Sequence, residues 1–194
     1  MKLRHLALPL MASLALLTAC SKEQPASTAD ATPIAAPQAL DVLAAQGKGF
    51  TAGALMAANP VYVLFDPQCP HCGHLWESSL PLHGKVKFVW LPVSLLNAKS
   101  TPQGAAILTA SNPVEAMTTH EKSLLTSQGG ISASSSVAPE VEAAIKANTA
   151  LLDRLGATSV PFVVARNQRT GAVVTAAGAM STETLTGFLG LAQP

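Results

Sequence analysis

Two cysteines separated by two residues are the part of this sequence that could carry chemistry. Cys69, Pro70, His71 and Cys72 follow an apolar run and open a segment typical of a helix. Residues three apart on a helix have Cβ atoms ~5 to 6 Å apart, and a disulfide needs ~3.5 to 4.5 Å, so a slight bend of the first turn would close the bond. The spacing predicts a redox pair that opens and shuts with little backbone motion.

The two thiols are expected to differ. Cys69 would stand at the helix start, where unpaired N–H groups and the positive end of the helix dipole favour a thiolate and lower its pKa from ~8.5 into the ~3.5 to 7.5 range. His71 adds a donor or partial positive charge, which favours the thiolate and makes the disulfide more oxidising. Cys72, one turn inward, is expected to be the less exposed, resolving thiol. Cys69 and Cys72 are thus the predicted catalytic residues, with Pro70 and His71 tuning them.

The same residues allow other interpretations. A structural zinc site usually needs four Cys or His ligands. The cysteine pair could bind a metal with one or two of the histidines that the chain offers, His71, His74, His83 and His120. A purely structural disulfide closing so small a loop would constrain little of the unfolded chain. We expect His74 and His83 to be solvated, and we expect no cofactor or metal besides a redox-active disulfide.

The elements that would position the pair follow from periodicity and breakers. Strands are predicted at Val61–Phe65, Lys85–Val93, Phe162–Ala165 and Ala172–Thr175, the last two forming a hairpin. Helices are predicted at Asp41–Ala45, from Pro70 to before Pro81, from Pro102, from Pro113 after an Asn112 cap, over Glu140–Leu155 before Gly156, and from a Thr182 cap. Trp76 and Trp90 are expected in the core. Asp66 is expected in a turn or cap, with a role as a proton acceptor that tunes the thiols as the alternative. The order indicates an α/β fold.

A second motif precedes the third predicted strand. Val160-Pro161 stands directly before Phe162 and resembles the cis-proline loop of thioredoxin-fold proteins. In that family the loop faces the cysteine pair and presents backbone groups to a peptide substrate. The resemblance therefore implies a substrate-binding role for Val160 and Pro161.

Together these motifs resemble the catalytic domain of the bacterial thiol:disulfide interchange proteins DsbG and DsbC, DsbG more closely. The resemblance rests on Phe65-Asp66-Pro67-Gln68-Cys69-Pro70-His71-Cys72, Trp76, Lys85–Val93, Ala105–Leu108, Asn112-Pro113, Gly129-Gly130, and Leu151–Ala157 through Val160-Pro161. It implies a thioredoxin-like fold with a helical insertion, about residues 101–156, between the CxxC helix and the cis-Pro strand. Two features depart from that branch: residues 21–58 are too short for its N-terminal dimerisation domain, and the Pro-His pair and Val160 look like the oxidase DsbA.

The first residues have the features of an export signal. Lys2 and Arg4 precede an apolar run from Leu6 to Ala19, which is too short for the ~20 residues of a membrane-spanning helix. Leu-Thr-Ala before Cys20 resembles a lipobox, in which that cysteine becomes the lipidated first residue; an ordinary signal peptide is the alternative. We therefore predict a signal peptide at 1–19, a lipidated Cys20 with a flexible tether to 38, and a folded domain at 39–194.

The charge composition of the chain limits the classes of partner that it could bind. The chain of 194 residues has a net charge of +1 and 12% charged residues, with no run of Lys or Arg, which argues against nucleic-acid binding. The sequence predicts a monomeric periplasmic lipoprotein, with the outer membrane favoured over the inner membrane. Its predicted partners are protein thiols and disulfides and a membrane redox partner of the Dsb type. The alternatives are a DsbA-like dithiol oxidase and a non-catalytic metal or thiol carrier using the same cysteines.

Overall fold

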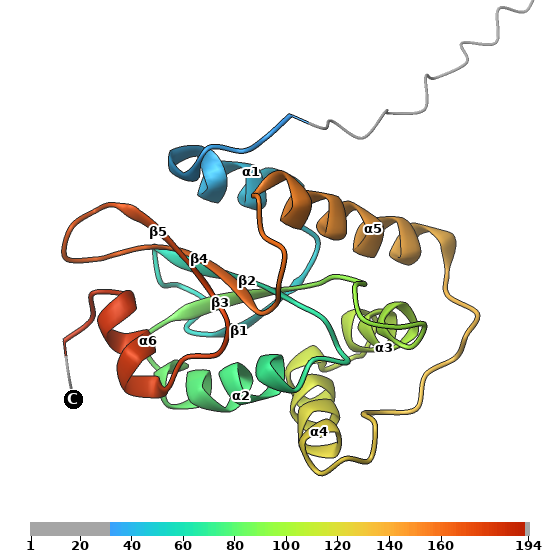
Figure 1. Cartoon of the computed structure of the whole chain (residues 1–194). Helices are drawn as coiled ribbons and strands as arrows, with labels where there is room; N and C mark the ends of the chain where they lie inside the picture. The colour runs from blue at the N-terminus through green and yellow to red at the C-terminus, as the bar shows by residue number, and fades with distance from the viewer. Residues whose placement is uncertain (1–31, 193–194) are drawn as a thin grey trace, which may run out of the picture.

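A five-stranded mixed sheet forms the centre of the molecule (Figure 1). The computed structural model describes residues 32–192, so the predicted signal peptide and Cys20 lie outside the described residues. The strands are β1 (Phe50–Gly53), β2 (Pro60–Phe65), β3 (Lys87–Pro92), β4 (Phe162–Arg166) and β5 (Val173–Ala177), in the spatial order β1-β3-β2-β4-β5. Only β2 and β3 run parallel among these strands; the other neighbours are antiparallel. The expected α/β class is confirmed.

The central strands are buried on both faces, as their continuous apolar sequence predicted. Every residue of β2 after Pro60 is buried. Trp76 and Trp90 lie in the core, with ring centroids 5.1 Å apart in an edge-to-face arrangement. Phe65, the last residue of β2, packs on Trp90 at 5.6 Å. This aromatic cluster fixes the end of β2 from which the cysteine loop departs.

Helices cover both faces of the sheet and one of its ends (Figure 1). They are α1 (Ala39–Gln46), α2 (Pro70–Ser79), α3 (Ser100–Leu108), α4 (Pro113–Leu125), α5 (Pro139–Arg154) and α6 (Thr182–Phe188). In the figure α1 and α5 lie on one side of the sheet, α2 and α6 lie on the other, and α3 and α4 lie beside α2 and α5. Two short 3-10 turns, Ala36–Gln38 and Leu80–Leu82, complete the order.

The helical insertion has the caps that the sequence predicted. Asn112 accepts a hydrogen bond from the backbone N–H of Glu115 at 3.2 Å and so caps α4. After α5, Gly156 adopts φ +71°, the left-handed conformation that ends a helix at little cost for glycine. α4 packs against both α2 and α3. The insertion therefore reaches the helix that carries the cysteines.

Three expectations need correction. Strand β1 was not predicted, because its four residues follow Gly49, end in Gly53 and carry little β-pattern of their own; the strand forms by pairing with β3. The cap of α6 is Ser181, whose hydroxyl accepts from Thr184 N–H, and Thr182 is the first helical residue. His83 is half-buried rather than solvated, and its ring packs on Trp76.

The packed part of the chain also starts ahead of the expected boundary at residue 39. Ile34 is buried, and its backbone N–H donates to the Arg154 carbonyl at 2.8 Å. Residues 34–38 thus belong with the folded domain rather than with a tether. None of the helices within residues 32–192 combines the length and apolar character needed to cross a bilayer.

Candidate active site

Cys69 and Cys72 lie at the junction of β2 and α2. Cys69 is the N-cap of α2, with extended backbone angles (φ −99°, ψ 109°), and Pro70 occupies the first turn. The Cys69 carbonyl accepts a hydrogen bond from Cys72 N–H at 2.9 Å, and Cys69 N–H donates one to the Asp66 carbonyl at 3.0 Å. Both thiols are in the reduced form, and their residues are 5% and 0% exposed. Pro70 suits this place because a first-turn residue needs no hydrogen-bond donor.

The thiol of Cys69 is electrostatically favoured as a thiolate. Its pKa is lowered to about 6, first by a hydrogen bond from the Cys72 thiol and then by the backbone N–H groups of Cys72 and His71, against the opposing effect of burial. The charge of the His71 side chain is the weakest of these causes, and His71 is exposed. The helix start therefore acts on Cys69 chiefly through short-range donors.

Cys72 behaves oppositely. Burial raises the pKa of the Cys72 thiol well above its ordinary value, and the hydrogen bond to Cys69 and the charges of Cys69 and Glu121 act in the same direction. At neutral pH one sulfur is thus poised to react as an anion while the other holds its proton. Such an asymmetry suits a nucleophile and a resolving thiol.

The second predicted motif comes to the same place. The Val160–Pro161 peptide bond is cis, and both residues are buried. The Cys69 thiol donates to the Val160 carbonyl at 3.5 Å. The fold therefore brings together Cys69, Cys72 and the Val160-Pro161 loop, whereas the His71 side chain remains at the surface.

Asp66, three residues before Cys69, is fully buried and fully hydrogen-bonded. Its Oδ1 accepts from Gln68 N–H and from the Ser100 hydroxyl, both at 2.8 Å. Its Oδ2 accepts from the N–H groups of Leu95 and Leu96 at 2.7 and 3.0 Å. One carboxylate thereby joins the cysteine loop, the segment after β3 and the start of α3, which agrees with the expected turn or cap role.

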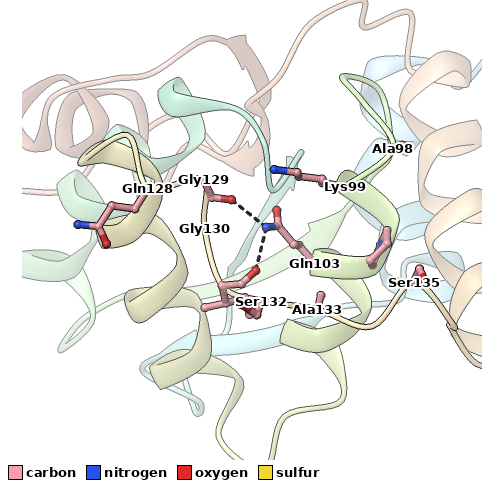
Figure 2. Close-up of a pocket in the computed structure, with 11 residues that line it drawn as sticks. Ala98, Lys99, Gln103, Gln128, Gly129, Gly130, Ser132, Ala133 and Ser135 are labelled. Carbon is pink, nitrogen blue, oxygen red and sulfur yellow. Dashed lines mark hydrogen bonds between the residues drawn. The ribbon is translucent and has the colours of Figure 1, made fainter.

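Gln68 and Gln103 are site residues that sequence reasoning missed. The Gln68 amide donates to the Gln103 side-chain carbonyl and to the Gly129 carbonyl, and so ties the residue before Cys69 to the insertion. Gln103 is buried and donates to the carbonyls of Gly129 and Ile131, each at 2.9 Å, as Figure 2 shows for Gly129. Gln103, Gly129 and Ile131 also line a pocket of about 430 Å³, which neither cysteine lines.

Glu121 was missed by sequence reasoning, and its neighbour His120 was considered only as a possible metal ligand. His120 is fully buried in α4; Ile131 N–H donates to its Nδ1 at 3.2 Å, so its Nε2 donates to the Pro67 carbonyl at 2.6 Å. Glu121 is 1% exposed, and neither of its oxygens has a hydrogen-bond partner in the structure. The available signal was their place on the buried stripe of α4 with Met117, at spacings of three and four residues.

The histidines do not gather around the cysteines. His74 is exposed, His83 packs on aromatic rings, and both ring nitrogens of His120 face backbone groups. Among residues 32–192 no three His, Cys, Asp or Glu side chains are placed to hold a metal ion. The donor set imagined for a metal carrier is therefore not assembled in this part of the chain.

Comparison with known proteins supports the same family resemblance. No family model matches the chain. The chain is 28% identical over 113 residues to the thiol:disulfide interchange protein DsbG of Pseudomonas aeruginosa, and 32% identical over 108 residues to DsbG of Escherichia coli. The alignments cover 55% and 53% of this chain and 42% of each relative. The chain thus spans less than half the length of the curated relatives it matches.

Solved structures confirm the fold. The catalytic domain of Proteus mirabilis ScsC superposes with a TM-score of 0.63 at 17% identity, covering 79% of this chain and 96% of that domain. A periplasmic thioredoxin-like protein from Salmonella enterica superposes with a TM-score of 0.59 at 16% identity, covering 74% of this chain and 88% of that protein, and this confirms the expected thioredoxin-like fold. In sequence the chain is similar to part of the bacterial thiol:disulfide interchange protein DsbG, and in fold it is similar to the catalytic domain of ScsC.

Proposed function

We propose that this protein is a thiol-disulfide oxidoreductase that exchanges disulfides with protein substrates through Cys69 and Cys72. The observation that carries the proposal is the opposite perturbation of two sulfurs one helical turn apart: the pKa of Cys69 is lowered to about 6, and that of Cys72 is raised. The similarity to DsbG supports the same chemistry.

The reaction proceeds by two thiolate attacks. The Cys69 thiolate attacks a substrate disulfide, forms a mixed disulfide and releases the first substrate thiolate. Cys72 then loses its proton and attacks the Cys69 sulfur, which closes the Cys69–Cys72 disulfide and releases the second substrate thiolate. The substrate gains two electrons and the pair loses two. The reverse sequence transfers a disulfide to a dithiol substrate.

The Val160-Pro161 loop is the proposed substrate-binding element. The Val160 carbonyl lies 3.5 Å from the Cys69 sulfur. A substrate polypeptide that donates a backbone hydrogen bond to this carbonyl would therefore hold its cysteine beside Cys69. Leu95 and Leu96, whose N–H groups bond Asp66 at the base of the cysteine loop, are 42% and 52% exposed. These apolar side chains favour a protein substrate over a small polar disulfide.

The direction of exchange depends on the reduction potential. We propose DsbG- or DsbC-like interchange as the leading role, with DsbA-like oxidation as the alternative, because Pro70 and His71 match the oxidase pattern. A stabilised Cys69 thiolate favours the reduced pair and so makes the disulfide a stronger oxidant. Titration in glutathione buffers separates the roles: a reduction potential of about −120 mV indicates an oxidase, and a far more negative one indicates reduction or isomerisation.

Trapping of the mixed disulfide tests the proposal. A Cys72→Ala variant should accumulate a covalent adduct with a client protein that has been reduced and then reoxidised, so that it carries disulfides. A Cys69→Ala variant should accumulate no adduct. Full exchange activity in Cys69→Ala would refute the proposal. Stoichiometric copper or zinc binding by the wild type, without any exchange, would instead favour the metal or thiol carrier.

The cellular setting is proposed from the sequence. A signal peptide at 1–19 and lipidation of Cys20 would place the domain in the periplasm as a membrane-anchored monomer, with the outer membrane favoured over the inner membrane. A Dsb-type membrane partner would reset its redox state. Cys20→Ala should release the protein from the membrane fraction. Retention of that variant in the membrane fraction would refute the anchor.

A further inference from the structure

A pocket near the cysteine loop has no part in the exchange steps described above. It has a volume of about 430 Å³ and lies between the start of α3 and the loop that joins α4 to α5 (Figure 2). The Gln68 side chain, from the residue before Cys69, donates to the carbonyl of Gly129 in the pocket lining at 3.3 Å. The pocket therefore begins one glutamine side chain away from the residue that precedes Cys69.

The loop on one side of the pocket has its acceptors occupied and its donors open. The Gly129 and Ile131 carbonyls accept from the Gln103 amide, each at 2.9 Å. The Gly130 carbonyl accepts from the Ser123 hydroxyl at 3.1 Å. Within the described part of the chain, several backbone N–H groups of this loop have no acceptor, those of Gly129, Gly130, Ser132 and Ala133. The loop therefore offers a ligand chiefly hydrogen-bond donors.

The charge of the pocket acts in the same direction. Of the described residues that line it, Lys99 alone is charged, and none is Asp or Glu. Figure 2 shows the Lys99 side chain pointing toward Gly129, and Lys99 Nζ lies 3.9 Å from the position that a Cβ on Gly129 would take. No carboxylate of residues 32–192 pairs with this ammonium group. An ammonium beside open N–H groups favours a carboxylate, which accepts several hydrogen bonds at once.

Two glycines hold the loop in this arrangement. Gly129 and Gly130 adopt φ +83° and +84°, the left-handed region that favours glycine. A Cβ on Gly130 would collide with the His120 ring, so the loop backbone packs directly on that buried ring. His120 also accepts from Ile131 N–H at 3.2 Å. The loop is therefore fixed before a ligand arrives, which reduces the ordering cost of binding.

An exposed strip joins the cysteine loop to the pocket. Leu95 and Leu96, which follow β3, are 42% and 52% exposed. Asn97 comes next and donates to the Gln68 side chain at 3.2 Å, and Lys99 stands two residues later at the start of α3. Three extended residues span roughly 10 Å, on the order of one glutamine side chain with its hydrogen bond and one Cα–Cα step. A client bonded to the cysteine pair would thus cross the leucines and reach Lys99 within a few residues.

We propose that this pocket binds an acidic side chain of the client polypeptide and that Lys99 determines the specificity for it. The inference rests on the proposed function and adds a sequence preference to it: an Asp or Glu within a few residues of the reacting cysteine. The client carboxylate accepts from Lys99 Nζ and from N–H groups of the glycine loop. No bond forms or breaks in the pocket. Its contribution is to hold the client while exchange takes place at Cys69.

Peptide disulfides of matched sequence test the inference. Each peptide has one cysteine bonded to 2-nitro-5-thiobenzoate, a leucine next to it, and Glu, Gln or Lys two to four positions away. The Cys69 thiolate of the reduced full chain attacks the peptide sulfur, joins it in a new S–S bond and releases the coloured thiolate, which reports the rate. For the best position we expect the Glu peptide to react about three- to fivefold faster than the Gln peptide at low salt, and less so at high salt.

Charge variants assign the preference to the pocket. Lys99→Gln should reduce the ratio of the Glu to the Gln rate to below about 1.5, and Lys99→Glu should favour the Lys peptide instead. Lys146→Glu, which makes the same charge change at an exposed residue of α5, is the matched control and should keep the wild-type ratio. An unchanged ratio in Lys99→Glu, or equal wild-type rates for Glu and Gln at every position, would overturn the inference. Failure of the wild type to react with any peptide would instead refute the proposed function.

NMR locates the carboxylate without reference to rates. In Cys72→Ala, which keeps the mixed disulfide, the amide signals of Gly129 and Gly130 should shift more in the Glu adduct than in the Gln adduct. Free glutarate is the probe for a small carboxylate that is not part of a client. Amide shifts with glutarate, but none that distinguish the Glu and Gln adducts, would overturn the assignment of the pocket to a client side chain.

Discussion

The protein buries two carboxyl groups beside its cysteine pair and treats them in opposite ways. Asp66 accepts four hydrogen bonds, from the segment after β3, from α3 and from its own loop. Glu121, equally buried on α4, accepts none within the described structure. A carboxylate with every lone pair occupied holds segments together, whereas one without partners can gain or lose a proton. Burial alone therefore does not tell an acid that holds segments together from one that is left without hydrogen-bond partners.

The two sulfurs repeat this contrast. Cys69 is supported by donors from Cys72 and from the backbone, which lower its pKa, whereas burial dominates at Cys72 and raises its pKa. The group that must be charged before reaction is surrounded by donors, and the group that must keep its proton until the second step is not. Each of the following tests perturbs one side of the comparison.

The largest effect is expected at Asp66. Asp66→Ala should lower the free energy of unfolding by about 3 to 5 kcal/mol, because it leaves the Ser100 hydroxyl and three backbone N–H groups buried without an acceptor. Urea denaturation measures the change. Asp66→Asn, which keeps one acceptor oxygen, should lose less. A cost below about 1 kcal/mol for the alanine variant would remove the structural role assigned to Asp66.

Gly73→Ala should crowd the unpartnered acid. The new methyl group would lie 2.7 Å from Glu121 Oε2 and 3.1 Å from Leu125 Cγ, so we expect destabilisation by about 1 to 3 kcal/mol despite the better helix propensity of alanine. The loss should shrink when Glu121→Ala is added, as a double-mutant cycle measures.

Gly84→Ala is the control for this substitution, because no atom lies within 4 Å of a Cβ at Gly84. Equal losses at positions 73 and 84, or strict additivity with Glu121→Ala, would mean that Gly73 does not make room for the acid.

Glu121→Gln should change how stability depends on pH. The folded protein keeps the Glu121 proton to about pH 9, whereas the unfolded chain loses it near pH 4.5. Between these values the unfolded state binds fewer protons, so the wild type loses stability as pH rises, and the variant lacks this loss.

Thermal unfolding between pH 5 and 8 measures the difference. We expect the Tm of Glu121→Gln to gain on the wild type as pH rises, at about 2 to 4 °C per kcal/mol for a domain of this size. A constant Tm difference across this range would contradict a buried, titrating carboxyl group at position 121. Asp66→Asn serves as the comparison, since its effect comes from lost hydrogen bonds.

The smallest effect is expected at His71. The rate of Cys69 alkylation should show a midpoint at about pH 6 in the wild type. His71→Ala should raise this midpoint by less than about one unit, or 1.4 kcal/mol, because the His71 charge is the weakest of the causes that lower the Cys69 pKa. Cys72→Ala should raise it more, since the Cys72 hydrogen bond is the strongest cause. The reverse ranking would return the main tuning role to His71.

Local rules were enough for much of the fold. The apolar run of β2, the proline that opens α2 and the Asn112 cap of α4 each act within a few residues, so they were correctly located from sequence. Strand β1 was not predicted from sequence, because its four residues gain their conformation from pairing with β3. The thioredoxin-like fold was inferred from resemblance and is confirmed by superposition on a thioredoxin-like protein.

For the site, the sequence by itself determined the cysteine pair, its place at a helix start and the expected difference between the two thiols, because these follow from spacing along one turn. Only the tertiary structure decided that Cys69 meets the carbonyl of Val160, a residue 91 positions away, and that Asp66 is saturated while Glu121 is not. Hydrogen-bond partners of buried groups are set by which segments the fold brings together, and that information is not local.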